Sequence, residues 1–262
     1  MIDTHSHIHG KEFTSDIDGV LQRAADANVS RIALVGVNPD DAVTALELAR
    51  LNPEVCYVIT GLHPHEASQW NAYVRDRLRE QVLTHPGRVV AVGEMGLDYH
   101  YDFAPKDAQK MAFRGQLKLA REVNLPISIH CREAYDDCLE ILQEFYSGGK
   151  ASDQPNGVLH CYFGTVEQAK QSVELGFMLG IGGASTFKKT EELHRVIEAI
   201  PLEYLVLETD APYMAPVPYR GKRNEPSYLS HVRARIAELK SLSEADVERV
   251  TDANAFRLFR WN

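Results

Sequence analysis

Six side chains of metal-binding types stand at or near the ends of short apolar segments that lie far apart in the sequence. They are His5, His7, Glu94, His130, His160 and Asp210. Imidazole and carboxylate groups together bind zinc, manganese and similar divalent ions, and a carboxylate that ends a buried apolar run is costly without a cation nearby. The set indicates a metal centre, provided that the fold brings these segment ends together.

The spacing of these residues suggests how they share two ions. His5 and His7 are alternate residues of an extended segment, so both imidazoles point to the same side and can reach one ion together with Asp210. His130 and His160 would bind the second ion. Glu94 would bridge both ions at about 3.5–4 Å. We therefore expect two divalent cations per chain, with Mg, Mn and Zn all compatible with the ligand set.

Each of these residues also has a simpler interpretation. A single buried histidine is commonly a hydrogen-bonded core residue, Asp210 could cap a turn, and Glu208 could pair with a cation. It is hard to explain six metal-binding side chains at five segment ends as independent accidents. We therefore favour a metal site over a rim of polar residues without a metal.

Four further residues are candidates for catalysis or substrate binding. His63 follows the apolar segment 55–62 and would act beside the metals, while His65 would orient its loop. Arg132 lies two residues after His130, and Arg223 belongs to the basic stretch 220–226; both could bind phosphate oxygens. Aromatic residues in the connecting segments could stack unpaired bases. They are Trp70, Tyr99, Tyr101, Phe103, Tyr162, Phe163, Tyr213 and Tyr219.

The elements that would position these groups alternate along the whole chain. Apolar, β-branched segments predict eight strands at residues 1–5, 31–37, 55–62, 89–97, 126–130, 157–161, 177–182 and 204–208. Amphipathic segments predict helices at 15–28, 40–51, 67–84, 105–123, 133–146, 166–175, 190–199, 227–239 and 243–259.

This alternation predicts a single-domain (β/α)8 TIM barrel over residues 1–262 with additional C-terminal helices. In such barrels the active site lies at the carboxyl ends of the strands, where the candidate ligands stand. An open doubly wound sheet would require a glycine-rich turn after its first strand, but residues 5–10 read His-Ser-His-Ile-His-Gly. Residues 147–157 are predicted to form a surface loop.

Composition limits the setting in which the protein works. Lys and Arg total 28 against 37 Asp and Glu, and this net charge of −9 opposes non-specific adhesion to nucleic acid. A nucleic-acid substrate would have to be held locally, by metals and a few arginines. The four cysteines form no CxxC pair, and no run of about 18 apolar residues predicts a membrane span. We expect a soluble cytoplasmic protein with reduced thiols.

Five motifs resemble those of the TatD family of metal-dependent deoxyribonucleases. They are Asp-Thr-His-Ser-His at 3–7, Gly-Leu-His-Pro-His at 61–65, Gly-Glu-Met-Gly-Leu-Asp-Tyr at 93–99, Glu-Thr-Asp-Ala-Pro-Tyr at 208–213 and Arg-Asn-Glu-Pro at 223–226. The resemblance implies trimming of single strands or 3′ ends in DNA repair or turnover. Cys131 replaces a serine that is common in the family, and residues 161–164 also vary, which leaves substrate preference open.

The expected reaction is hydrolysis of a phosphodiester by a water that the two cations activate. Asp210 would orient this water and accept its proton, His63 would donate to the leaving oxygen, and Arg132 and Arg223 would bind the phosphate. Two alternatives remain open: hydrolysis of an amide, ester or lactone by the same kind of barrel, and a non-catalytic metal-dependent binding module. Glu94 and the basic stretch 220–226 favour phosphate as the substrate.

Overall fold

The structure, a computed structural model, describes residues 1–147 and 154–261. Its strands are β1 (Ile2–Ser6), β2 (Arg31–Gly36), β3 (Cys56–Thr60), β4 (Val89–Asp98), β5 (Ile127–Arg132), β6 (Gly157–Leu159), β7 (Phe177–Ile181) and β8 (Leu205–Leu207). All neighbouring strands pair in parallel, in the order of the sequence from β1 to β8. A parallel bridge between Ser6 and Ala211 joins the two ends of the sheet, so the barrel is nearly closed.

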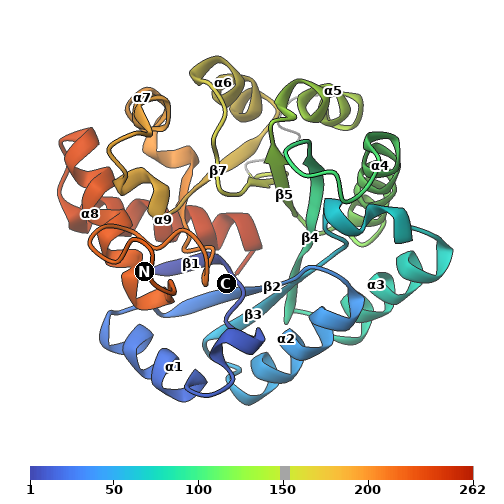
Figure 1. Ribbon diagram of the computed structural model, residues 1–262, viewed down its shortest axis with the longest axis horizontal. Coiled ribbons are helices and arrows are strands. Elements are labelled where there is room, and N and C mark those ends of the chain that lie inside the picture. The colour runs from blue at the N-terminus through green and yellow to red at the C-terminus, as the bar shows by residue number, and fades with distance from the viewer. Residues whose placement is uncertain (148–153, 262) are drawn as a thin grey trace.

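Helices surround this barrel, as Figure 1 shows. The α-helices are α1 (Ile17–Asp26), α2 (Pro39–Leu51), α3 (Ala72–Thr84), α4 (Lys106–Glu122), α5 (Tyr135–Tyr146), α6 (Val166–Glu174), α7 (Glu191–Ala199), α8 (Leu229–Lys240) and α9 (Glu244–Phe259). Short 3₁₀ helices are η1 (Lys11–Phe13), η2 (Pro64–Gln69), η3 (Gly183–Thr186), η4 (Leu202–Tyr204) and η5 (Pro226–Tyr228). The predicted (β/α)8 barrel with C-terminal helices is confirmed.

Two apolar layers hold the barrel together. Between strands and helices, residues such as Leu34 of β2 and Phe113 of α4 are fully buried in one large cluster. Inside the barrel a second cluster includes Val35, Ile59 and Val206, and the end of α9 adds Phe259 to it. Because this end of α9 lies near the starts of β2 and β3, it covers the face opposite to the strand ends that carry the candidate ligands.

One predicted helix differs from the structure. Residues 67–84 were expected to form a single helix, but they are divided between η2 and α3. The side chain of Asn71 accepts the backbone N–H of Val74 at 3.1 Å, which starts a new helix at Ala72. The predicted surface loop at 147–157 falls mostly outside the described residues.

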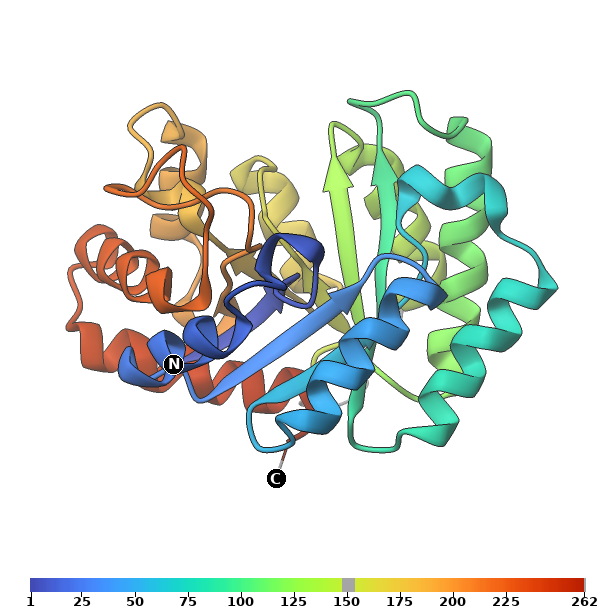
Figure 2. The same cartoon turned by 60° about the horizontal axis from the view of Figure 1, so that its bottom comes forward.

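The strands differ in how far they extend. β4 is ten residues long and buried throughout, and its partner β5 runs alongside its second half. Figure 2 shows this pair and the β4–α4 connection beyond their ends. In the described residues, no helix combines the length and apolar character needed to cross a lipid bilayer.

Candidate metal centre

The first two candidate ligands, His5 and His7, lie in β1 and directly after it. The Nε2 atoms of His5 and His7 lie 3.3 Å apart. His7 donates its Nδ1–H to the carbonyl oxygen of Val35 at 2.8 Å, so Nε2 is the ring nitrogen that can bind an ion once its proton has left. Two imidazoles of one strand end thus point at a common position, as their alternation in sequence predicts.

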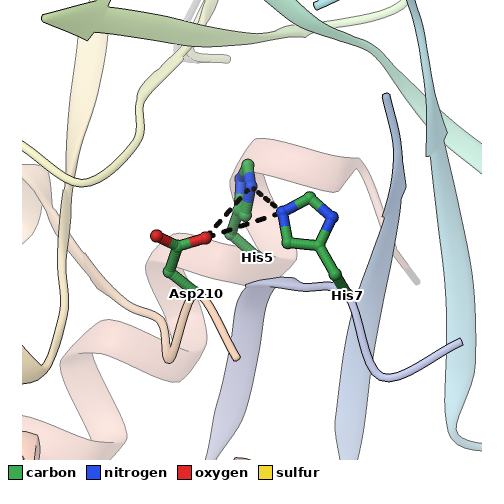
Figure 3. A group of neighbouring side chains, drawn as sticks. All are labelled: His5, His7 and Asp210. Carbon is green, nitrogen blue, oxygen red and sulfur yellow. Dashed lines mark hydrogen bonds and ion pairs between the residues drawn. The ribbon is translucent and has the colours of Figure 1, made fainter. Parts of the chain in front are cut away.

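Asp210 reaches the same position from the other edge of the sheet. Its φ of +55° lies in the left-handed region, which Asp adopts more readily than most residues. Its backbone N–H donates to the carbonyl oxygen of His5 at 2.9 Å, which ties the turn after β8 to β1. Oδ1 of Asp210 lies 3.5 Å from Nε2 of His7 and 3.9 Å from Nε2 of His5, as Figure 3 shows.

Glu94 points into the barrel from the middle of β4. Gly93 precedes it with a φ of +152°, and a Cβ at Gly93 would lie 2.4 Å from the carbonyl oxygen of Ser128. A residue with a side chain would be excluded by that contact. The β4–β5 register shifts between Val92 and Met95, around the glutamate. The glycine therefore allows the close approach of β5 that brings Glu94 to the centre.

The two carboxylate oxygens of Glu94 face different pairs of histidines. Oε2 lies 3.5 Å from Nε2 of His5 and 3.9 Å from Nε2 of His7. Oε1 lies 2.8 Å from Nδ1 of His130 and 2.7 Å from Nε2 of His160. These last two nitrogens are 3.3 Å apart. Glu94 is thus the link between two groups of possible ligands.

The spacing of the donor atoms suits metal ions. Ligands around a tetrahedral zinc ion are separated by about 3.3–3.6 Å, given bonds of about 2.0–2.2 Å. In the first group, the donor atoms of His5, His7, Asp210 and Glu94 lie 3.3 to 3.9 Å from one another. In the second group Glu94 is at hydrogen-bonding distance from both histidines. Imidazole nitrogens and carboxylate oxygens in these positions fit divalent cations.

The electrostatics of the centre also favour binding of a cation. Burial alone would raise the pKa of Glu94, but His160, His63 and His130 outweigh it and hold this pKa well below its usual value. Burial would lower the pKa of His7, yet the hydrogen bond to Asp210 and the charge of Glu94 raise it to about 9. Glu94 and Asp210 thus keep their negative charge and favour the protonated form of the neighbouring His7.

A further carboxyl group lies behind His160. Glu208 is fully buried, and its Oε1 accepts the backbone N–H of Cys161. Burial and the nearby charge of Asp210 raise the pKa of Glu208 well above its usual value. Its Oε1 lies 3.8 Å from Nδ1 of His160, and together with His5 these residues form another group of possible ligands. Sequence reasoning treated Glu208 only as a possible ion-pair partner.

His63 stands beside Glu94 on the side of the second group. Its Nε2 is 3.5 Å from Oε1 of Glu94, and its Nδ1 accepts the backbone N–H of His65 at 3.1 Å. A neutral His63 therefore carries its proton on Nε2, facing the centre. Burial lowers the pKa of His63, which favours this neutral form.

Asp98 is a member of the centre that sequence reasoning missed. It is fully buried at the end of β4, and its Oδ2 lies 2.9 Å from Nε2 of His130 and 3.0 Å from Nε2 of His65. Its Oδ1 accepts the backbone N–H of His100 at 3.0 Å. By accepting from Nε2, Asp98 leaves Nδ1 of His130 to face Glu94. The available signal was its position, four residues after Glu94 on the same face of the strand.

Asp3 joins the first and last strands below the centre. This fully buried carboxyl accepts the backbone N–H of Thr209 at 2.9 Å and the Thr209 hydroxyl at 2.6 Å. Burial raises the pKa of Asp3 to about 7 despite these hydrogen bonds. The contact fixes the residue directly before Asp210, so it helps to place that ligand beside β1.

The two arginines predicted to bind phosphate lie in different environments. The guanidinium of Arg132 is 4.9 Å from the ring centroid of Tyr101, and no carboxylate of the described residues lies within ion-pairing distance of it. Arg223 instead donates to both carboxylate oxygens of Asp16, each at 2.8 Å, and covers the ring of Phe13. Arg132 is therefore free at the rim, whereas Arg223 holds the 220–226 segment against the start of α1.

Comparison with known proteins agrees with this geometry. The sequence model of TatD related DNase matches residues 2–260. An uncharacterized metal-dependent hydrolase of Bacillus subtilis, YabD, is 40% identical over 262 residues, which cover 100% of both chains. A 3′-5′ ssDNA/RNA exonuclease TatD of Rahnella is 35% identical over 264 residues, or 99% of this chain and 98% of that protein.

A solved structure supports the same relationship. The crystal structure of YJJV, a TatD homologue from Escherichia coli K12, superimposes with a TM-score of 0.92 at 31% identity. The match covers 100% of this chain and 98% of that one. Together with the whole-chain family match and the relatives in Bacillus and Rahnella, this places the chain in the family of TatD-related DNases.

Proposed function

We propose that the protein is a divalent-metal-dependent nuclease that removes nucleotides from the 3′ end of single-stranded nucleic acid. The observation that carries the metal chemistry is Glu94, whose two oxygens face two different pairs of histidines. The substrate class rests on the related Rahnella protein, which is named a 3′-5′ ssDNA/RNA exonuclease.

Two groups of residues would hold the ions, which we propose to be Mg, Mn or Zn. The first comprises His5, His7 and Asp210, the second His130 and His160, and Glu94 would bind both ions. When bound, the cations would lower the pKa of water and offset negative charge on the phosphate. We propose no role for a third ion at Glu208.

Asp210 and His63 would move protons. One oxygen of Asp210 faces the two histidines, and Figure 3 shows the other pointing away from them, which supports its use as a base that accepts a proton from water. His63 would donate the proton on Nε2 to the leaving oxygen. The hydrogen bond between its Nδ1 and the N–H of His65 supports that tautomer.

Arg132 would bind a non-bridging phosphate oxygen, because its charge faces no carboxylate of the described residues. Arg223 would first have to exchange its pair with Asp16 for a phosphate, so we assign it the weaker contact. We further propose a cytoplasmic location and a role in DNA repair or turnover. The unpaired state of all four cysteines agrees with a reducing compartment.

The test is a time course on 5′-labelled single-stranded and double-stranded DNA and on single-stranded RNA. The protein is first stripped of metal and then supplied with Mg, Mn or Zn. We expect a ladder of products that shorten from the 3′ end of the single strands, and no products with chelator. Failure to hydrolyse any phosphodiester with any of the three ions would overturn the proposal.

The bridging role of Glu94 has its own test. Glu94→Gln keeps the shape of the side chain but removes the charge and one good ligand oxygen, so we expect activity to disappear and metal content to fall below that of the wild type. Metal per chain is measured by elemental mass spectrometry after gel filtration. Glu133→Gln, at an exposed carboxylate paired with His100, is the control. Unchanged metal content in Glu94→Gln would exclude the bridge.

A further inference from the structure

Two large aromatic side chains are exposed on the rim next to the metal centre. Tyr101 and Phe103, in the connection between β4 and α4, are 43% and 66% exposed. Their rings are 5.3 Å apart, and the ring of His65 lies 5.5 Å from Tyr101 and 4.7 Å from Phe103. We call His65, Tyr101 and Phe103 the aromatic ledge.

Tyr101 and Phe103 of the ledge do not pack into the hydrophobic core. Neither Tyr101 nor Phe103 belongs to a hydrophobic cluster of the described residues, whereas Tyr99, two residues before Tyr101, packs against the core. Exposure of one large apolar side chain is common, whereas contiguous exposed apolar groups rimmed by polar residues are a feature of binding surfaces. Packing within the protein therefore does not account for these two side chains.

A continuous row of rings connects the ledge with the metal centre. The ring of His65 lies 4.3 Å from that of His63 and 6.3 Å from that of His130. His63 and His130 both contact Glu94. A strand whose reacting phosphate lay at Glu94 therefore has a path along these rings to the ledge. Figure 2 shows that the β4–α4 connection stands beyond the end of β4.

Arg132 places a positive charge against the ledge, while Asp102, between Tyr101 and Phe103 in the sequence, is an exposed carboxylate. The guanidinium of Arg132 stacks over Tyr101 at 4.9 Å, and the described residues offer it no carboxylate at ion-pairing distance. The neighbouring Glu133 pairs with His100 at 2.7 Å. A cation on one ring next to exposed rings is the arrangement that binds an anionic backbone and a flat base together.

We propose that the aromatic ledge stacks an unpaired nucleobase of a nucleic-acid strand, while Arg132 contacts the phosphate next to it. This inference rests on the proposed nuclease function and adds the part of the surface that selects single strands. A base within a duplex is already stacked on both faces and cannot lie flat on Phe103. Stacking tolerates any base, so little sequence preference is expected from this contact.

The test compares two substrates with and without bases. The first is a short single-stranded oligothymidylate; the second is methyl p-nitrophenyl phosphate, a phosphodiester that has no nucleobase. For Phe103→Ala we expect kcat/KM on the oligonucleotide to fall about five- to 150-fold more than on the small diester, because stacking typically contributes about 1–3 kcal/mol per base. Phe103→Trp, which keeps a flat ring, should restore the oligonucleotide activity.

Tyr73 provides a matched control. It is 69% exposed and lies 5.9 Å from the guanidinium of Arg77, but it belongs to α3, outside the barrel rim. Tyr73→Ala should leave the ratio of the two activities at the wild-type value. If Phe103→Ala lost the same factor of kcat/KM on both substrates, so that their ratio stayed at the wild-type value, the stacking role of the ledge would be overturned.

A binding experiment separates failure of the ledge from failure of the nuclease. Fluorescence anisotropy of a labelled oligothymidylate is measured with chelator present, so that no turnover occurs. If the wild type binds the oligothymidylate and Phe103→Ala binds it at least fivefold more weakly, the stacking role of the ledge is supported even if no substrate is hydrolysed. If the wild type hydrolyses DNA and Phe103→Ala matches it in both assays, the nuclease stands and the ledge is wrong. Absence of both binding and hydrolysis in the wild type overturns both.

Discussion

The carboxylates of the centre differ in what their two oxygens contact. Glu94 directs both oxygens to histidines, one to each ligand group. Asp98 receives two imidazoles on one oxygen and backbone N–H groups on the other. Asp210 offers one oxygen to His5 and His7 and points the other away from both (Figure 3). The same chemical group can therefore bridge, orient or accept a proton, according to its neighbours.

Asp210→Asn tests the last of these roles. The amide has almost the same shape but cannot accept a proton as the carboxylate does, so kcat at saturating metal should fall by at least about 10²-fold. Steady-state kinetics are measured on protein whose metal content matches that of the wild type. A kcat close to the wild-type value in such a sample would leave Asp210 as a ligand or turn residue only.

Asp98→Asn tests whether Asp98 orients the candidate ligand His130 through the ring nitrogen that does not face Glu94. Loss of the charge that holds Nε2 of His130 should weaken binding of one ion by about 10–100-fold. Calorimetric titration of the metal-free protein measures the affinity, and nitrogen NMR shifts report which ring atom of His130 carries the proton. Asp107→Asn, at the exposed start of α4, is the control. If Asp98→Asn bound both ions with the same affinities as the wild type, this role would be contradicted.

Some contacts of individual residues could not be predicted from the sequence. His5, His7, Glu94 and Asp210 were identified because each ends an apolar run, and that signal is local. Asp98 binds His65 across 33 positions, and Arg223 binds Asp16 across 207. No local pattern reports such partners. The loop composition of 220–226 indicated a free basic cluster, whereas the fold gives Arg223 a carboxylate.

At the scale of elements, strands were easier to predict than the segments between them. A parallel strand buried on both faces is a continuous apolar run, and all eight predicted strands lie within a few residues of those observed. The 3₁₀ helices have no comparable signal, since three to six residues are too few for an amphipathic pattern. The division of residues 67–84 depended on one side-chain hydrogen bond, that of Asn71.

The role of α9 as a cover of the barrel leads to a prediction about stability. Leu258 is fully buried against the barrel interior, so Leu258→Ala should reduce the free energy of unfolding by about 2–5 kcal/mol. Urea denaturation followed by circular dichroism measures the change. Leu242→Ala, at a residue that is 43% exposed, should change it by about 0.5 kcal/mol or less. Metal content should be unaffected, because α9 and the ligands lie at opposite ends; loss of metal would contradict that separation.

At the scale of the molecule, the candidate metal centre connects residues that lie far apart in the sequence. β1, β4, β5, β6 and the turn after β8 all contribute, and only folding brings them together. The unfolded chain offers no comparable set of ligands. Ions that bind here must therefore stabilise the whole domain and not just a loop.

Removal of metal should accordingly lower the melting temperature. A single ion at 100 times its Kd contributes about 2.7 kcal/mol, which corresponds to a shift on the order of 5–10 °C for a domain of this size. Scanning calorimetry with and without chelator measures it. Glu94→Gln should show a much smaller shift than the wild type. Equal melting temperatures of the wild-type protein in both conditions would show that the centre does not bind ions in the folded state.

The joining of β8 to β1 has a consequence for biosynthesis. His5 and His7 leave the ribosome well before their partner Asp210, which is made about 10–40 s later at ordinary rates of translation. During that interval the nascent chain carries a His-x-His pair that lacks its third ligand. Any metal captured early would be held weakly and exchanged easily. The ion that remains is therefore selected by the finished barrel and not by the order of synthesis.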